Sequence, residues 1–182
     1  MQEIIKTPID GLKILKPLIH KDSRGFFFES FNQKIFNSTL GNTIKFVQDN
    51  HSFSKKNVLR GLHLQIKKPQ GKLVRVLNGS IFDVAIDLRK HSKTFAHWHG
   101  CILSRRNKNQ LWIPPGFAHG FLSLKNNTEV LYKTTDYWDK NDEYTILWND
   151  KTININWPKF ENLTISEKDK QGQTLKKLIN IL

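Results

Sequence analysis

The sequence has little of several features that would mark a specialised class of protein. It contains a single cysteine, Cys101, which excludes an internal disulfide and a zinc cluster built on thiolates. No apolar run approaches the roughly 20 residues that a membrane-spanning helix needs. The first residues carry an acid at Glu3 and lack an apolar stretch followed by a cleavage site, so we expect no signal peptide. These absences favour a reducing, cytoplasmic location and no membrane partner.

Acidic residues are also scarce, with 16 Asp and Glu against 29 Lys and Arg and a formal net charge of +13. Such an excess suits either a nucleic-acid-binding face or a cationic pocket for a small anionic ligand. The lysines are spread along the whole chain, with only short clusters such as Lys55-Lys56. The sequence shows no recognition helix, zinc finger or RNA-binding signature. We therefore expect a small anionic ligand and no nucleic acid.

The sequence does contain many short apolar segments separated by turn residues, a pattern typical of strands. The expected strands cover residues 12–19, 45–48, 58–63, 73–77, 81–88, 95–103, 110–113, 120–124 and 130–135. Asn78-Gly79 is a strong hairpin signal between two of them. In the return strand, the polar or small residues at 83, 85 and 87 alternate with apolar ones. Many strands at short spacing favour a sandwich or a barrel.

Two segments favour helices instead. Residues 29–40 suit a short helix that Asn42 would end, and a second helix is expected after Ser166 toward Leu182. Ser166 suits an N-cap, and Glu167 and Asp169 suit the positive end of a helix dipole. The sequence thus predicts one all-β domain over residues 1–182 with a few short helices, one of them C-terminal. A small barrel of this kind can hold one ligand in its interior or mouth.

The segment Arg60-Gly61-Leu62-His63-Leu64-Gln65 places a histidine on a short apolar strand. Side chains alternate between the faces of a strand, so Leu62 and Leu64 share one face while His63 and Gln65 share the other. If the leucines pack against the core layer, His63 faces the barrel interior. An imidazole in a partly desolvated site suits a general base. The structural alternative is a core histidine hydrogen-bonded to a neighbouring strand.

Other polar side chains suit proton transfer beside a carbonyl group. Tyr132, on an expected inner strand, could donate its phenolic proton to a carbanion or an enolate. Lys72 follows Gly71 at the start of a strand, where a cation could stabilise an enolate oxygen. Arg60 and Arg24 have the geometry to bind phosphate through two donors. The alternative for the tyrosine is packing, and for each cation it is a solvated surface position.

His119 raises the question of a metal. It lies in Pro114-x-Gly116-x-x-His119, a spacing that often supplies a metal ligand in cupin-type barrels, together with a His-x-His motif and a glutamate. Here the corresponding strand reads His63-Leu64-Gln65, and an amide oxygen is a poor ligand for transition metals. A His-x-His does occur at His97-Trp98-His99, on a different strand. We therefore expect a site without metal, and a metal-dependent cupin enzyme is the alternative.

Asp169 is a further candidate near the C-terminus. A carboxylate can hold the Nδ1–H of an imidazole, which fixes its tautomer and raises its basicity. The structural alternative is an acid in the first turn of a helix. From the residues alone, the structural alternative is the better interpretation.

Taken in order, these motifs resemble the dTDP-4-dehydrorhamnose 3,5-epimerase family, and the likeness runs almost end to end. The matching segments are residues 24–31, 46–50, 60–63, 71–75, 110–114, 116–120, 132–135 and 166–169. So many matches in one order and at family-like spacing argue against chance similarity.

The resemblance implies a cupin-type jelly-roll barrel, or double-stranded β-helix, that binds no metal and needs no cofactor. It implies a homodimer in which an N-terminal strand is exchanged between subunits. His63 would be the general base paired with Asp169, Tyr132 the general acid, and Lys72 the cation that stabilises the C4 enolate. The implied nucleotide-sugar contacts are Arg24, Glu29, Gln48, Asn50, Arg60, His119, Glu143 and Lys168.

The implied substrate is a dTDP-linked 4-keto-6-deoxy hexose, whose keto group acidifies the hydrogens at C3 and C5. The implied reaction inverts both carbons of dTDP-4-dehydro-6-deoxy-D-glucose and gives dTDP-4-dehydro-L-rhamnose. A 3-epimerase or 3,4-ketoisomerase of a related nucleotide-linked 4-keto sugar is one alternative. A cupin that only binds sugar nucleotides or nucleic acid is another.

One segment departs from the family pattern. Where the family has tandem tyrosines, this chain reads Asp136-Tyr137-Trp138. The second family tyrosine stacks on the thymine ring, and Trp138 is also a flat aromatic side chain that can stack. Stacking tolerates any base, so Trp138 leaves the identity of the nucleotide open.

Overall fold

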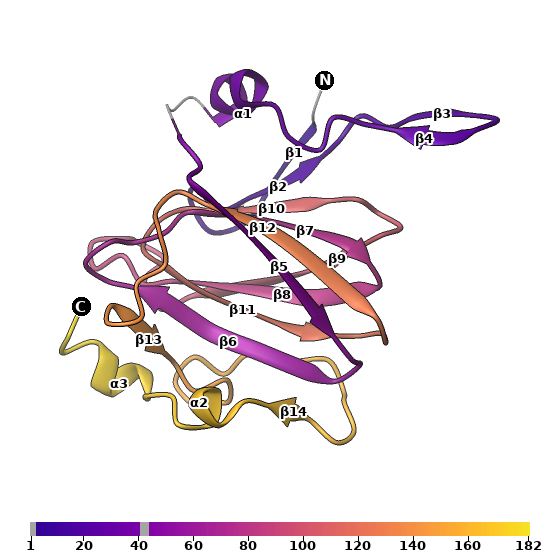
Figure 1. Cartoon of the computed structure of the whole chain (residues 1–182). Helices are drawn as coiled ribbons and strands as arrows, with labels where there is room; N and C mark the ends of the chain where they lie inside the picture. The colour runs from indigo at the N-terminus through magenta and orange to yellow at the C-terminus, as the bar shows by residue number, and fades with distance from the viewer. Residues whose placement is uncertain (1–2, 41–43) are drawn as a thin grey trace.

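The computed structural model describes residues 3–40 and 44–182. Two sheets face each other, and a hairpin extends away from them (Figure 1). The first sheet has the order β1 (Glu3–Lys6), β2 (Lys13–Lys16), β10 (Gln110–Ile113), β7 (Lys72–Asn78), β12 (Thr128–Thr134) and β5 (Gln48–Ser54). The second has the order β13 (Glu143–Thr145), β6 (Val58–Gln65), β11 (Phe117–Ser123), β8 (Ser80–Asp87) and β9 (Trp98–Ser104). The hairpin consists of β3 (His20–Asp22) and β4 (Gly25–Phe27).

The chain moves repeatedly between the two sheets. Strands β5, β7, β10 and β12 belong to the first sheet, while β6, β8, β9, β11 and β13 belong to the second. A short strand, β14 (Thr164–Ile165), adds to the second sheet parallel to β6. This crossing pattern is that of a jelly roll, and the predicted fold class is therefore confirmed.

The main hydrophobic core lies between the sheets. It includes Val74 and Val76 of β7, Ile81 and Ala85 of β8, and Val130 of β12, all buried. These positions are two or four residues apart within a strand, as expected for one face of a strand. The same inward faces carry polar residues at one end of the barrel, and there the core gives way to a cavity.

Both sheets are also covered on their outer faces. Leu62 and Leu64 of β6 pack with Leu175 and Leu178 of α3 (Leu175–Leu178), so the C-terminal segment covers the second sheet. Helix α1 (Gln33–Leu40) covers part of the first sheet through a second apolar cluster. The burial of both leucines places His63 on the opposite, inward face, as the alternation in the sequence predicts.

Each strand expected from the sequence overlaps an observed one. The weakest match is residues 45–48, which meet β5 only at Gln48, although Val47 N–H already donates to Thr134 O at 2.9 Å. Five strands were not predicted from the sequence, namely β1, β3, β4, β13 and β14. All are short, and the hairpin is exposed along its whole length, so none carries a buried alternating pattern.

The first predicted helix is shorter than expected. It begins at Gln33 rather than at residue 29, because the side chain of Asn32 accepts hydrogen bonds from the N–H groups of Lys34 and Ile35. Asn42, which was expected to end it, lies outside the described residues.

The prediction of one C-terminal helix is wrong. The chain forms two short helices, α2 (Glu167–Lys170) and α3, separated at Gly172. The Gly172 backbone lies against Ile146, where an added Cβ would come within 2.9 Å of the Ile146 carbonyl carbon. Gln173 pairs with the strand-like segment around Ile146, so a long-range contact ends the first helix. The predicted N-cap is confirmed, because Ser166 Oγ accepts from Asp169 N–H at 3.1 Å.

Among the described helices, none is both long and apolar enough to cross a lipid bilayer.

Candidate active site

The cavity at the polar end of the barrel has a volume of about 410 Å³ and lies between the two sheets. Its walls bring together most of the residues that the sequence analysis singled out. The lining residues are Gln48, Asn50, Ser52, Arg60, His63, Gln70, Lys72, His119, Phe121, Tyr132, Trp138, Glu143 and Lys168. Polar and charged groups thus converge on one space that can hold a small ligand.

His63 projects into this cavity from β6 and is held from behind by Asp169 of α2. His63 Nε2 lies 2.6 Å from Asp169 Oδ1, and the carboxylate is almost fully buried. The carboxylate was expected at Nδ1 of the imidazole, whereas in the structure it lies at Nε2. In the neutral ring with Nε2–H donating to Asp169, Nδ1 is a free acceptor. This arrangement can fix the tautomer of a general base.

Two further contacts fix the position of Asp169. Its Oδ2 accepts from Gly61 N–H at 3.2 Å, and its own N–H is bound by the Ser166 cap. Burial opposes ionisation of this carboxyl, but the hydrogen bond and charge of His63, together with the hydrogen bonds from Gly61 and Ser166, outweigh burial and lower the pKa of Asp169. The carboxylate is therefore ionised at neutral pH beside the imidazole.

Gly61 is needed for the local backbone geometry. It has φ +107° and lies so close to β11 that an added Cβ would come within 2.6 Å of His119 O. Only glycine accommodates both the positive φ and this close approach. The Arg60-Gly61-Leu62-His63 segment therefore brings β6 and β11 together where His63 and His119 face each other in register.

Tyr132 and Lys72 lie on the opposite sheet, on the neighbouring strands β12 and β7. Burial raises the pKa of Tyr132, and the negative charge of Glu143 raises it further. The phenol is therefore protonated throughout the neutral range. Burial also lowers the pKa of Lys72 to about 8, against the opposing charges of Glu143 and Asp83. Lys72 is thus mainly an ammonium ion at pH 7.

Glu143 of β13 lies on the other side of the His63 ring. Its Oε1 is 3.9 Å from His63 Nδ1, and its Oε2 forms an ion pair with Lys168. This pair connects α2 to the cavity wall. The imidazole therefore lies between two carboxylates, one hydrogen-bonded and one within reach of the cavity-facing nitrogen.

His119 has its own carboxylate partner, which the sequence analysis did not identify. His119 Nε2 lies 2.7 Å from Oδ1 of Asp83, a fully buried residue of β8. The alternation of residues 83, 85 and 87 already placed Asp83 on one face of its strand. What the pattern lacked was any indication that this face pointed into the barrel.

Three more lining residues were missed, namely Ser52, Gln70 and Phe121. A sequence signal existed for Ser52, because it follows Gln48 and Asn50 with the period of two that marks one face of a strand. Gln70 hydrogen-bonds Asp136 O at 2.9 Å, and so connects the start of β7 to the loop after β12.

The mouth of the cavity carries the aromatic residue that departs from the family pattern. Trp138 is 52% exposed, and its backbone N–H donates to Gln48 Oε1 at 3.0 Å. Gln48 in turn donates to Asn50 Oδ1 at 2.8 Å. Arg60 is oriented by Ser54 Oγ at 3.1 Å and Phe53 O at 2.9 Å. The mouth thus offers a flat apolar surface beside amide and cationic groups.

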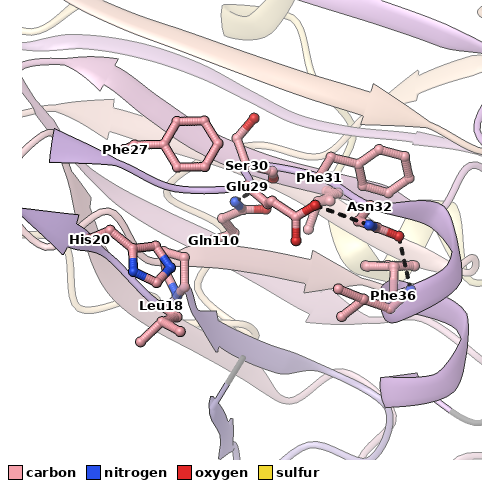
Figure 2. A pocket seen from close by; sticks show the side chains of 12 residues that line it. Leu18, His20, Phe27, Glu29, Ser30, Phe31, Asn32, Phe36 and Gln110 are labelled. Atoms are coloured by element: carbon pink, nitrogen blue, oxygen red, sulfur yellow. Dashed lines mark hydrogen bonds between the residues drawn. The ribbon is translucent and has the colours of Figure 1, made fainter. Parts of the chain in front are cut away.

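Besides Asp169, which lies behind His63, two predicted site residues do not line this cavity. Arg24 lies in the turn of the β3–β4 hairpin, with its side chain 88% exposed and paired with Asp22 at 2.6 Å. Figure 2 shows Glu29 in a separate pocket of about 100 Å³, where it accepts a hydrogen bond from Asn32 at 3.1 Å. Within this chain, neither residue reaches His63.

The histidines considered as metal ligands do not converge. Among the residues that the structure describes, no three His, Cys, Asp or Glu side chains are placed to hold one metal ion. His99 on β9 and His119 on β11 pair with the same residue of β8, Ala85, from opposite sides, so a whole strand separates them.

Known proteins are similar to this chain along almost its whole length. The sequence model of the dTDP-4-dehydrorhamnose 3,5-epimerase family matches residues 6–177. The dTDP-4-dehydrorhamnose 3,5-epimerase of Shigella flexneri is 54% identical over 171 residues, which cover 93% of this chain and 94% of the relative. The dTDP-4-dehydrorhamnose 3,5-epimerase of Escherichia coli K12 is 51% identical over 179 residues, which cover 98% of this chain and 97% of the relative.

A solved structure extends the similarity to three dimensions. The dTDP-6-deoxy-D-glucose-3,5-epimerase of Legionella pneumophila, crystallised in complex with dTDP-4-keto-L-rhamnose, is 50% identical to this chain. The two structures have a TM-score of 0.94 and share 97% of this chain and 94% of that one.

Proposed function

Because the chain belongs to the dTDP-4-dehydrorhamnose 3,5-epimerase family, we propose that it inverts C3 and C5 of dTDP-4-dehydro-6-deoxy-D-glucose to give dTDP-4-dehydro-L-rhamnose. One observation carries the mechanism. His63 and Tyr132 project into the same cavity from opposite sheets, so a sugar ring between them has a base on one face and an acid on the other. Inversion of a carbon by two fixed groups requires this arrangement.

In the first half of the reaction, His63 removes the proton from the carbon next to the keto group. The electron pair of the broken C–H bond forms the carbon–carbon double bond of an enolate, and the C4 oxygen gains the negative charge. The Lys72 ammonium stabilises this oxygen in a site of low dielectric constant. Asp169 stabilises the imidazolium that forms on His63.

In the second half, Tyr132 donates its proton to the same carbon from the opposite face. The carbonyl group is restored and the configuration of that carbon is inverted. The proton on His63 and the proton lost from Tyr132 are exchanged with solvent. The same two proton transfers then take place at the second carbon, and neither oxidation nor reduction occurs.

The remainder of the cavity suits the nucleotide diphosphate. Arg60 and Lys168 supply positive charge, and Gln48 and Asn50 supply amide groups. His119 and Glu143 complete the polar wall, and Trp138 at the mouth suits stacking on the base. The scarcity of cysteine supports a cytoplasmic location for this reaction.

We propose further that the protein is a homodimer whose N-terminal segment completes the partner's site. Large apolar side chains are exposed on β1, just after β2, on the hairpin, on α1 and on β5. Exposed apolar side chains of this kind suit an interface. They are Ile5, Leu18, Phe26, Phe27, Ile35 and Phe53. The hairpin carries Arg24 away from its own barrel (Figure 1), in a position to reach a second molecule.

This arrangement predicts complementation between two inactive variants. Arg24→Ala and His63→Ala are each expected to form weakly active or inactive homodimers. In a mixed dimer, the intact cavity of the Arg24→Ala subunit receives the intact hairpin of the other subunit. We therefore expect co-expression to restore up to about half of the wild-type activity per mixed dimer, measured after tandem-tag purification.

If Arg24 served the cavity of its own chain, neither site of the mixed dimer would be complete. The mixed dimer would then show no recovery, which would contradict the proposal that the hairpin completes the partner's site. A mixture of His63→Ala with Tyr132→Phe is the matched control. His63 and Tyr132 of one chain line the same cavity, so each cavity of the mixed dimer lacks one of them and no recovery is expected.

The reaction itself is tested by incubating the protein with dTDP-4-keto-6-deoxyglucose in deuterated water and following it by NMR. We expect deuterium at both C3 and C5. Deuterium at C3 alone would identify a 3-epimerase, and migration of the keto group would identify a 3,4-ketoisomerase. A folded protein that gives no exchange at either carbon would contradict the proposed function.

A further inference from the structure

Asp83 is a buried carboxylate that the mechanism above does not use. It is fully buried in the middle of β8, on the inward face of the second sheet. Its Oδ1 binds His119 Nε2 at 2.7 Å, whereas its Oδ2 has no hydrogen-bond partner among the described residues. Burial of a half-satisfied carboxylate is costly, so a structural role alone does not account for it.

The surroundings of Asp83 contain few groups that compensate its charge. On β9 its direct neighbour is Cys101, whose thiol pKa is raised by burial and by the charge of Asp83. On β11 it meets His119. Lys72 lies two residues before the core residue Val74 of β7, and Asp83 lies between the core residues Ile81 and Ala85 of β8, so both side chains are on the inward faces of opposite sheets. Burial lowers the pKa of Lys72, and the charges of Glu143 and Asp83 oppose that shift.

Of these two carboxylates, Glu143 has other charged or titratable partners close to it. Glu143 already forms an ion pair with Lys168 and also lies near His63. The other titratable groups around the cavity that face Lys72 are Arg60, His63, His119, Tyr132 and Lys168. None of these is a carboxylate, so Glu143 and Asp83 are the two negative charges near Lys72 among the described cavity residues.

We propose that Asp83 is a positioning residue for the epimerase reaction. Its Oδ1 holds His119 in the tautomer that carries hydrogen on Nε2, and its charge keeps the Lys72 ammonium protonated beside the C4 oxygen. Asp83 thus acts through two residues from the two sheets, without touching the substrate. This inference rests on the proposed function.

Asp83→Asn separates charge from shape. The amide oxygen still accepts from His119 Nε2–H, so the ring orientation is kept while the negative charge is lost. Without that charge, Lys72 loses its proton at lower pH. We therefore expect the alkaline limb of the kcat/KM profile to move to lower pH. At a pH above the limb, kcat/KM of the variant should be lower than that of the wild type by roughly tenfold for each pH unit by which the limb moves.

Asp87→Asn is the matched control. Asp87 lies four residues along the same strand and is equally buried, but its carboxylate binds Arg89, Ser92 and Thr94 away from the cavity. We expect this variant to lose thermal stability and to keep the wild-type pH profile. A shift in Asp83→Asn alone separates positioning from a general effect of losing a buried carboxylate.

A wild-type profile in Asp83→Asn would overturn the inference, as would a uniform loss of activity with no movement of the limb. If Asp83→Asn does not fold, ¹⁵N NMR of the His119 ring in the wild-type protein decides. Hydrogen on Nε2 supports the proposal, and hydrogen on Nδ1 alone contradicts it. An inactive wild-type protein would instead contradict the proposed function, so the two failures are distinguishable.

Discussion

Replacing His63 with alanine is expected to reduce kcat by roughly 10²-fold or more, the scale typical of a general acid or base. The change removes the cavity-facing nitrogen and leaves Oδ1 of the Asp169 carboxylate without its hydrogen-bond partner. Because His63 begins the reaction at each carbon, exchange of deuterium into C3 and C5 should fall together with turnover. Both are measured in one NMR experiment.

The control for this change is His91→Ala. His91 is an exposed residue in the turn region after β8, and its substitution should leave both rates unchanged. Wild-type exchange by a folded His63→Ala protein would assign the base to another residue. Glu143 would then be the first to consider, because its Oε1 lies 3.9 Å from the position of His63 Nδ1.

Replacing Tyr132 with phenylalanine is expected to reduce net inversion by a similar factor of roughly 10². The proton-removing side of the site is intact in this variant, so the enolate still forms. His63 can return a solvent-derived proton only to the face from which it removed one. Deuterium should therefore enter the substrate with retention of configuration, and the ratio of exchange to epimerisation should rise.

Tyr144→Phe is the matched control for the loss of a phenolic hydroxyl. Tyr144 lies on β13 but packs against the outer apolar cluster of the second sheet rather than in the cavity. If Tyr132→Phe lost exchange and inversion in equal measure, Tyr132 would be needed to form the enolate rather than to protonate it. The assignment of the general acid would then be wrong.

The sequence predicts the inward direction of His63 because the alternation of a strand is a local property. Leu62 and Leu64 identify the buried face, and the opposite face follows. The C-terminal helix was mispredicted for the opposite reason. Its break at Gly172 depends on the backbone of Ile146, a contact that the residues around Gly172 do not reveal.

The candidate site shows the same limit at longer range. His63 and Asp169 are 106 positions apart, and only the resemblance to a family suggested that they meet. The partnership of Asp83 with His119 joins β8 to β11 and was not anticipated. Arg24 and Glu29 lie outside the cavity of their own chain, and the sequence of one chain does not say which molecule a residue serves.

Strand β6, which carries His63, is held firmly in the second sheet. This strand has β11 on one edge, β13 and β14 along the other, and its Gly61 N–H bound to Asp169 of α2. Separating β6 from its neighbours would therefore require breaking most of the second sheet, so its opening free energy approaches that of the whole fold. Among the described strands, β3 and β4 of the hairpin pair only with each other, and Lys108 Nζ lies 3.8 Å from the centre of the Phe26 ring. In a free subunit the hairpin can therefore move locally. The protein thus carries its base on the part that opens last and Arg24 on a part that is free to open first.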